Sequence, residues 1–165
     1  MHRFWLLALA AFIILSSIPA RAVVPEGALD NRARLVGGCL TLPEGYTSES
    51  EKGPDFTVER VKALPGAAAP DAMIGVYTGN YPSFQVPKGA KKEVVRTKIR
   101  KLTWYYWIQS HGESKYHHFE ARWVVEGSHT DDDEPPLQYH LFVTGTNLDQ
   151  VQALKRLVES ISKCE

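Results

Sequence analysis

Histidine and carboxylate side chains in the second half of the chain are the residues whose types could support chemistry. His118 and Glu120 lie two residues apart in one alternating stretch, and His140 lies in a later one. Because residues two apart on a strand share a face, the three could converge as a metal site or as acid–base groups of a small hydrolase. Adjacent His117 would point to the opposite face. No known ligand spacing accompanies the set, so we expect no metal and no cofactor.

Motifs of the common enzyme classes are missing from the sequence. It has no nucleophile elbow, phosphate-binding loop, dinucleotide fingerprint or His-Glu-x-x-His pair. The acidic run Asp131–Glu134 lacks the alternation of a calcium loop and indicates a solvated loop. We therefore expect no catalytic residue and a protein that is not an enzyme. The hydrolase stays an alternative, because catalytic groups converge in space and not in sequence.

A surface rich in aromatic and cationic side chains is the second feature of interest. If Trp104, Phe119 and Leu141 face a core, their sequence neighbours face away from it. Trp, Tyr and Arg are enriched in protein-binding surfaces. The alternative is that a loop or the N-terminal segment covers this face as a second small core. The candidate binding residues, called the outer sheet face below, are Tyr105, Trp107, His118, Arg122, His140 and Phe142.

A cationic stripe is expected beside that face. Arg96, Lys98 and Arg100 alternate with apolar or neutral residues in a strand expected near 93–100. Such a stripe either guards a surface strand against pairing with other chains or docks an anionic partner surface.

Strands, in which side chains alternate with a period of two, and a helix, with a period of about 3.6, must position these residues. Alternation with a period of two predicts strands, and short polar connections in the second half favour antiparallel hairpins. One short helical turn is expected near 26–35. The sequence therefore predicts an α+β fold: a mainly antiparallel sheet of six to seven strands with a C-terminal amphipathic helix packed on one face. The expected strands lie near 36–42, 55–63, 72–78, 93–100, 102–110, 115–126 and 137–144.

The C-terminal helix carries the clearest pattern. Asn147 can cap it, with Gln150 three residues on. The helix is expected to end near Lys163, which would put Cys164 on its buried stripe. Its apolar face is formed by Leu148, Val151, Leu154, Leu157, Val158 and Ile161.

The chain has only two cysteines, Cys39 and Cys164. In an oxidising compartment a lone pair is expected to form a disulfide, and no redox Cys-x-x-Cys spacing is present. Alternation puts Cys39 on the face opposite to Leu40 and Leu42. Either a bulge at Gly37-Gly38 re-aims Cys39, or Cys39 faces the helix and the two leucines do not.

The N-terminus has the features of a secretion signal. A short basic start precedes an apolar run from Phe4 to Leu15, too short for a bilayer span, and small residues predict cleavage after Ala22. An uncleaved anchor is the alternative. Residues 1–22 are thus expected to be a signal peptide, and residues 23–165 one exported domain, periplasmic or extracellular, without a membrane span. That domain would carry 17 basic and 19 acidic residues, a net charge of −2, which disfavours nucleic acid as a partner.

The order of parts resembles the PsbP/Mog1/DcrB-like group of small α+β domains. The resemblance lies in Leu42-Pro43-Glu44-Gly45-Tyr46, Tyr77-Thr78-Gly79, Trp104 and Val158-Glu159-Ser160-Ile161. Members of that group differ in function and include photosystem assembly factors and a partner of a small GTPase, so the resemblance carries no site residue.

The sequence is consistent with three functions. The first is a non-enzymatic protein-binding module that uses the outer sheet face, such as a periplasmic immunity or inhibitor protein. The second is an accessory or assembly factor of an envelope complex, which the resemblance implies. The third is the small histidine-dependent hydrolase or metal-binding enzyme.

Overall fold

The computed structural model describes residues 31–80, 82–125 and 136–164. The predicted leader and the acidic loop at Asp131 lie outside these residues. Within them, no helix is long and apolar enough to cross a membrane. The elements are β1 (Arg32–Leu35), β2 (Gly38–Thr41), β3 (Tyr46–Lys52), β4 (Phe56–Ala63), β5 (Ala72–Gly79), β6 (Lys91–Arg96), β7 (Lys101–His111), β8 (Ser114–Val124), β9 (Gln138–Gly145) and α1 (Leu148–Glu159).

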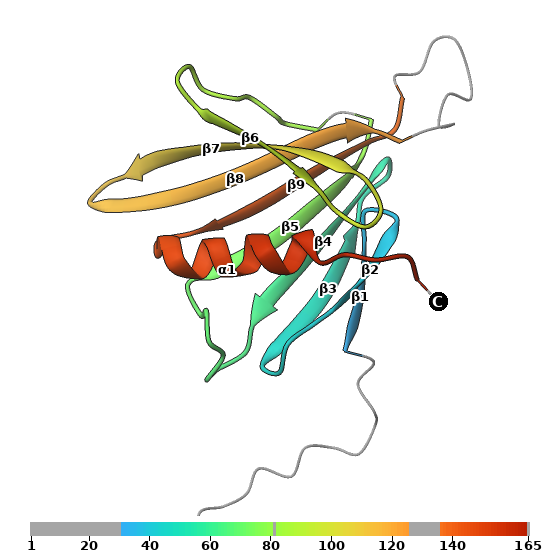
Figure 1. The fold of residues 1–165 in the computed structure, drawn as a ribbon, viewed down its shortest axis with the longest axis horizontal. Helices are drawn as coiled ribbons and strands as arrows, with labels where there is room; N and C mark the ends of the chain where they lie inside the picture. The colour runs from blue at the N-terminus through green and yellow to red at the C-terminus, as the bar shows by residue number, and fades with distance from the viewer. Residues whose placement is uncertain (1–30, 81, 126–135, 165) are drawn as a thin grey trace, which may run out of the picture.

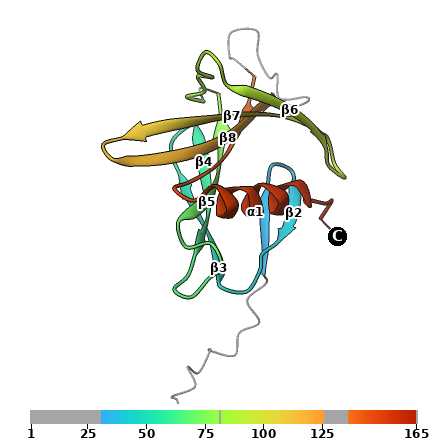
Figure 2. The same cartoon turned by 60° about the vertical axis from the view of Figure 1, so that its left-hand side comes forward.

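The fold is α+β, with one large antiparallel sheet and a C-terminal helix. The seven-stranded sheet has the order β3-β4-β5-β9-β8-β7-β6, and β1 and β2 form a separate hairpin. The sheet is strongly twisted, so that β7 and β8 run at a steep angle to β3 and β4 (Figure 1). Helix α1 and the β1–β2 hairpin lie side by side on one face of the sheet, as both views show (Figure 2). We call this the inner face and the opposite one the outer face.

The core lies between α1, the hairpin and the inner face. Trp104 is fully buried, and its indole Nε1 donates to the Glu159 carboxylate of α1 at 3.0 Å. Lys155 of α1 is also buried, where its ammonium group pairs with Glu159 and with Glu93 of β6 and lies over the Trp104 ring. The inner positions of the central strands are apolar and buried, as the alternation predicts: Ile74, Val76, Leu102, Phe119, Ala121, Leu141 and Val143.

The first strands depart from the sequence prediction. Residues 32–35 form β1, and not a helical turn, while Val36 and Gly37 form the tight turn to β2. Both turn residues have positive φ, 50° and 79°, as a two-residue hairpin loop requires. This conformation is unfavourable for a β-branched residue. Burial of the Val36 side chain in the core compensates for it.

Two further strand predictions are corrected. Strand β3 was not expected, because its residues are nearly all exposed and polar and it lies at the edge of the sheet. Strand β6 ends at Arg96, because Thr97 starts a turn in which its N–H and its hydroxyl both donate to the Arg100 carbonyl. The expected strand 93–100 is therefore wrong beyond residue 96.

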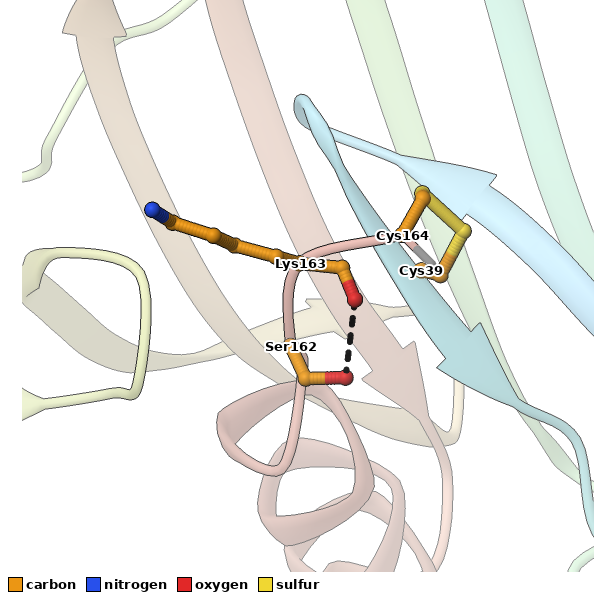
Figure 3. Close-up of a disulfide and its surroundings, with 4 residues drawn as sticks. All are labelled: Cys39, Ser162, Lys163 and Cys164. Atoms are coloured by element: carbon orange, nitrogen blue, oxygen red, sulfur yellow. Dashed lines mark hydrogen bonds between the residues drawn. A yellow bond between two sulfur atoms is a disulfide. The ribbon is translucent and has the colours of Figure 1, made fainter.

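The disulfide joins Cys39 to Cys164, with 4.9 Å between the two Cα atoms. Helix α1 ends at Glu159, so Cys164 does not lie on its stripe but in an extended tail. That tail pairs with β2, since the amides of Cys39 and Ser162 each donate to the carbonyl of the other residue. Figure 3 shows the tail crossing β2 at the sulfur bridge. Leu40 and Leu42 are buried. Cys39 forms the disulfide with the tail that follows α1, so neither a bulge that re-aims Cys39 nor a position facing the helix is required.

Candidate functional site

The sheet register places the six predicted residues of the outer sheet face on neighbouring strands. Trp107 lies directly opposite His118, and Arg122 lies directly opposite His140. Tyr105 and Phe142 flank Glu120, which is the cross-strand partner of both. Residues that face each other across an antiparallel pair share a face of the sheet. The six side chains therefore form one continuous surface over β7, β8 and β9.

Part of this surface is covered by the segment between β5 and β6. The Phe84 ring lies 5.1 Å from the His140 ring and 6.0 Å from the Tyr105 ring, both edge-on. The Arg122 guanidinium lies over the same ring at 5.3 Å. One side of the outer sheet face is thus a small aromatic cluster, as the covering-loop alternative proposed, with Phe84 as the residue that covers it.

A buried contact between a histidine and a carboxylate lies beneath that cluster. The His140 Nε2 and Glu120 Oε2 atoms are 2.7 Å apart, and both side chains are largely shielded from solvent. His140 itself is only 8% exposed. The contact therefore connects β8 to β9.

The other side of the face stays open around Trp107. The Trp107 and His118 rings stack with 5.4 Å between their centroids, and Tyr116 lies near the same imidazole. Burial lowers the pKa of His118 below its ordinary value, while the nearby Glu120 carboxylate opposes that shift and His117 adds to it. The neutral imidazole is accordingly favoured in this stack.

Phe142 lies flat over Gly75 of β5. A methyl group at Gly75 would collide with the Phe142 ring, so the glycine makes room for it. Phe142 is consequently half-buried and contributes less to the open surface than Trp107 does.

The predicted cationic stripe is divided by the turn after β6. Arg96 is exposed and lies opposite Lys101. Lys98 and Arg100 belong to the turn, and the Arg100 guanidinium lies 4.6 Å from the centre of the Trp123 ring. The three residues therefore do not form one stripe along a strand.

Two exposed lysines, Lys92 and Lys101, join Arg96 and Arg122 on the outer face. Lys92 lies opposite Tyr105, and Arg96 lies opposite Lys101. Sequence reasoning missed Lys92 because it began the strand at Glu93, although the alternation Lys92, Val94, Arg96 was present to be found, and it missed Lys101 because that residue fell between the expected strands 93–100 and 102–110. Lys92 thus lies beside Tyr105, while Arg96 and Lys101 lie four residues further along the strands, away from Trp107.

The predicted metal or hydrolase set does not converge. His118 lies opposite Thr144, whereas His140 lies opposite Arg122, so the two imidazoles are displaced along β8. His117 is on the inner face, as predicted, where its Nδ1 lies 2.9 Å from the Tyr106 hydroxyl. Within residues 31–80, 82–125 and 136–164 no group of three or more His, Cys, Asp or Glu side chains could hold a metal ion.

Two clefts on the inner face were not foreseen. One, of about 500 Å³, lies between the β1–β2 hairpin and the floor of the sheet, with Cys164 at its border. The other, of about 450 Å³, lies between the start of α1 and strands β6 to β8, beside Tyr106 and Leu148. Each is built from elements distant in sequence, so no local pattern indicates it.

Comparison of the chain with protein-family models, with curated proteins and with solved structures finds no match.

Proposed function

We propose that this chain is an exported, non-enzymatic module that binds another protein through the outer sheet face. The observation that carries the proposal is that four exposed cations and the aromatic residues Tyr105 and Trp107 share one face of neighbouring strands. Aromatic and arginine side chains are the residue types that dominate protein-binding energetics. The cations are Lys92, Arg96, Lys101 and Arg122.

The charge of this surface favours an acidic partner. Among the outward positions of β6, β7 and β8, all of which the structure describes, Glu120 is the sole carboxylate, and His140 pairs with it. Among the described residues, none of the four cations forms an ion pair. Complementary charge on a partner would accelerate encounter and fix its orientation.

Export is supported by two independent features. The disulfide between Cys39 and Cys164 belongs to an oxidising compartment, and the first 22 residues have the pattern of a cleavable leader. A periplasmic immunity or inhibitor protein would combine these features with a small, motif-poor chain. An acidic surface on the inhibited protein is then the complementary half of the interface.

The two other functions have weaker support. An envelope assembly factor rests on the resemblance to the PsbP/Mog1/DcrB-like group and would use the same surface. A hydrolase would need the His140–Glu120 pair, but His140 is buried and the Phe84 ring packs edge-on against its imidazole.

The test compares charge reversal on two faces of the molecule. Arg96→Glu combined with Lys101→Glu reverses two exposed, facing cations, while Arg32→Glu combined with Lys163→Glu makes the same charge change on the hairpin and tail. Tagged wild-type and variant proteins are used to capture partners from an envelope extract of the source cells. We expect one protein that the control retains and the outer-face variant loses.

The captured protein is then purified and titrated against all three forms. Loss of two charge-assisted contacts should weaken binding at least about tenfold, with a steep dependence on salt. Equal binding by the two variants would contradict the proposal. Binding of wild-type protein to anionic vesicles, with no protein captured, would overturn it in favour of a lipid surface.

A further inference from the structure

The cleft between the β1–β2 hairpin and the sheet, called the hairpin cleft below, has a polar floor where a core would be expected. Four residues form one row across four strands: Lys52 faces Thr57, Thr57 faces Thr78, and Thr78 faces Tyr139. All four lie on the inner face and line the cleft. Further along the same strands, this face is buried and apolar beneath α1.

The hydroxyl groups of this row have no hydrogen-bond partner among the described residues. Between the residues that the structure describes, the side-chain hydroxyls of Thr57, Thr78 and Tyr139 make no hydrogen bond. All three residues are half-buried and line the cleft. Packing alone would favour Val or Phe at such positions, because an unpaired polar group gains nothing from partial burial.

Two cations border the same cleft. Arg34 comes from the hairpin and Lys52 from the edge strand β3, and both side chains are exposed. Neither of them forms an ion pair with any other described residue. The acidic residue of the lining is Glu59, and burial raises the pKa of its carboxyl above the ordinary value. The lining of the cleft thus holds two basic side chains and one carboxyl.

We propose that the hairpin cleft binds a small hydroxylated anion, of the sugar-acid or sugar-phosphate class. The Arg34 guanidinium presents a planar set of donors that matches a carboxylate or phosphate group, and Lys52 adds a second positive charge. The row of hydroxyls pairs with hydroxyl groups of the ligand. The Glu59 carboxyl accepts a hydrogen bond from a further hydroxyl group of the ligand.

The dimensions of the cleft suit such a ligand. Its volume of about 500 Å³ lies within the range of small-molecule sites, about 300–1,000 Å³. Its walls are fixed, because the disulfide and the two Cys39–Ser162 hydrogen bonds hold the hairpin to the C-terminal tail. The site lies on the face opposite to the outer sheet face and does not depend on its function.

The first experiment titrates isotope-labelled full-length protein with glucuronate and with glucose 6-phosphate, followed by NMR. Both should shift the amide signals of Ser50, Thr57 and Thr78 in the cleft. Arg34→Ala should weaken binding about tenfold or more, the effect of losing a charge-assisted contact. Arg32→Ala is the matched control, because Arg32 is an exposed arginine of the same strand that does not line the cleft.

The second experiment separates the contribution of the ligand's anionic group to binding from that of its hydroxyl groups. Glucose and inorganic phosphate should each bind more weakly than glucose 6-phosphate. Thr78→Val should lower the affinity for glucose 6-phosphate and leave the affinity for inorganic phosphate unchanged. Absence of cleft shifts with millimolar glucuronate and glucose 6-phosphate would overturn the proposal. So would equal effects of Arg34→Ala and Arg32→Ala, or phosphate binding as tightly as glucose 6-phosphate.

Discussion

His118 shows how its surroundings set the properties of a single side chain. It stacks on Trp107 at the open side of the outer sheet face and is half-buried. Burial lowers its pKa, and the Glu120 carboxylate only partly opposes this effect. The folded protein therefore binds fewer protons at His118 than the unfolded chain does, between the folded pKa and the ordinary value of 6.5.

We predict that this residue makes the protein less stable in mild acid. As the pH falls below about 6.5, the unfolded chain gains a proton that folded His118 resists, so the free energy of unfolding should decrease until the folded pKa is passed. Urea unfolding of wild-type protein and of His118→Gln at a series of pH values would measure this contribution. A difference between the two that stays constant from pH 8 to pH 5 would contradict it.

At the scale of elements, α1 is attached to the sheet by its first turn. The Asn147 side chain caps the helix as predicted, accepting from the amides of Asp149 and Gln150 at 3.0 and 3.2 Å. Gln150 has another partner, because its side-chain oxygen accepts from the Asp71 amide just before β5. The start of α1 is thus bonded both to its own backbone and to the connection between β4 and β5.

Removal of the cap should destabilise the protein moderately. Asn147→Ala leaves two helix amides without a side-chain partner and should lower the free energy of unfolding by about 1 kcal/mol. Asn147→Asp keeps the acceptor, and its charge suits a helix N-terminus, so its stability should match that of the wild type. Chemical denaturation of the three proteins checks this; equal losses in both variants would show that the acceptor is not what stabilises the helix start.

On the scale of the whole molecule, the disulfide joins the two ends of the described fold. Cys39 and Cys164 are 125 residues apart in sequence, and nearly every strand lies within the closed loop. A cross-link across so long a loop greatly reduces the conformational entropy of the unfolded chain. It also connects the hairpin to α1, and with it the wall of the hairpin cleft to the core.

The double variant Cys39→Ala/Cys164→Ala should therefore lose about 4 kcal/mol of unfolding free energy. The tail should stay beside β2, because the Cys39–Ser162 backbone bonds do not need the sulfur atoms. Denaturation with and without a reductant provides the measurement. Reductant should destabilise the wild type to the level of the variant and leave the variant unchanged; a variant as stable as the oxidised protein would refute this prediction.

Much of the fold was predictable because it is encoded in local periodicity. Strands β4, β5, β7, β8 and β9 follow their alternation closely, and α1 follows its apolar stripe. The shared face of Trp107 and His118 needed only that alternation and a hairpin between the two strands. Strand β3 escaped prediction because an exposed edge strand has no buried face and hence no apolar alternation.

By itself, the sequence determined the fold class, the inward and outward faces of the central strands and the two partners of the disulfide. These follow from the period of side-chain direction and from the presence of only two thiols. The tertiary structure decided that Phe84 covers His140, that Arg96 lies opposite Lys101, and that Arg34 lines the same cleft as the Lys52–Tyr139 row. Such placements depend on strand register and on which loop crosses which face, and these arise from packing between residues far apart in the chain.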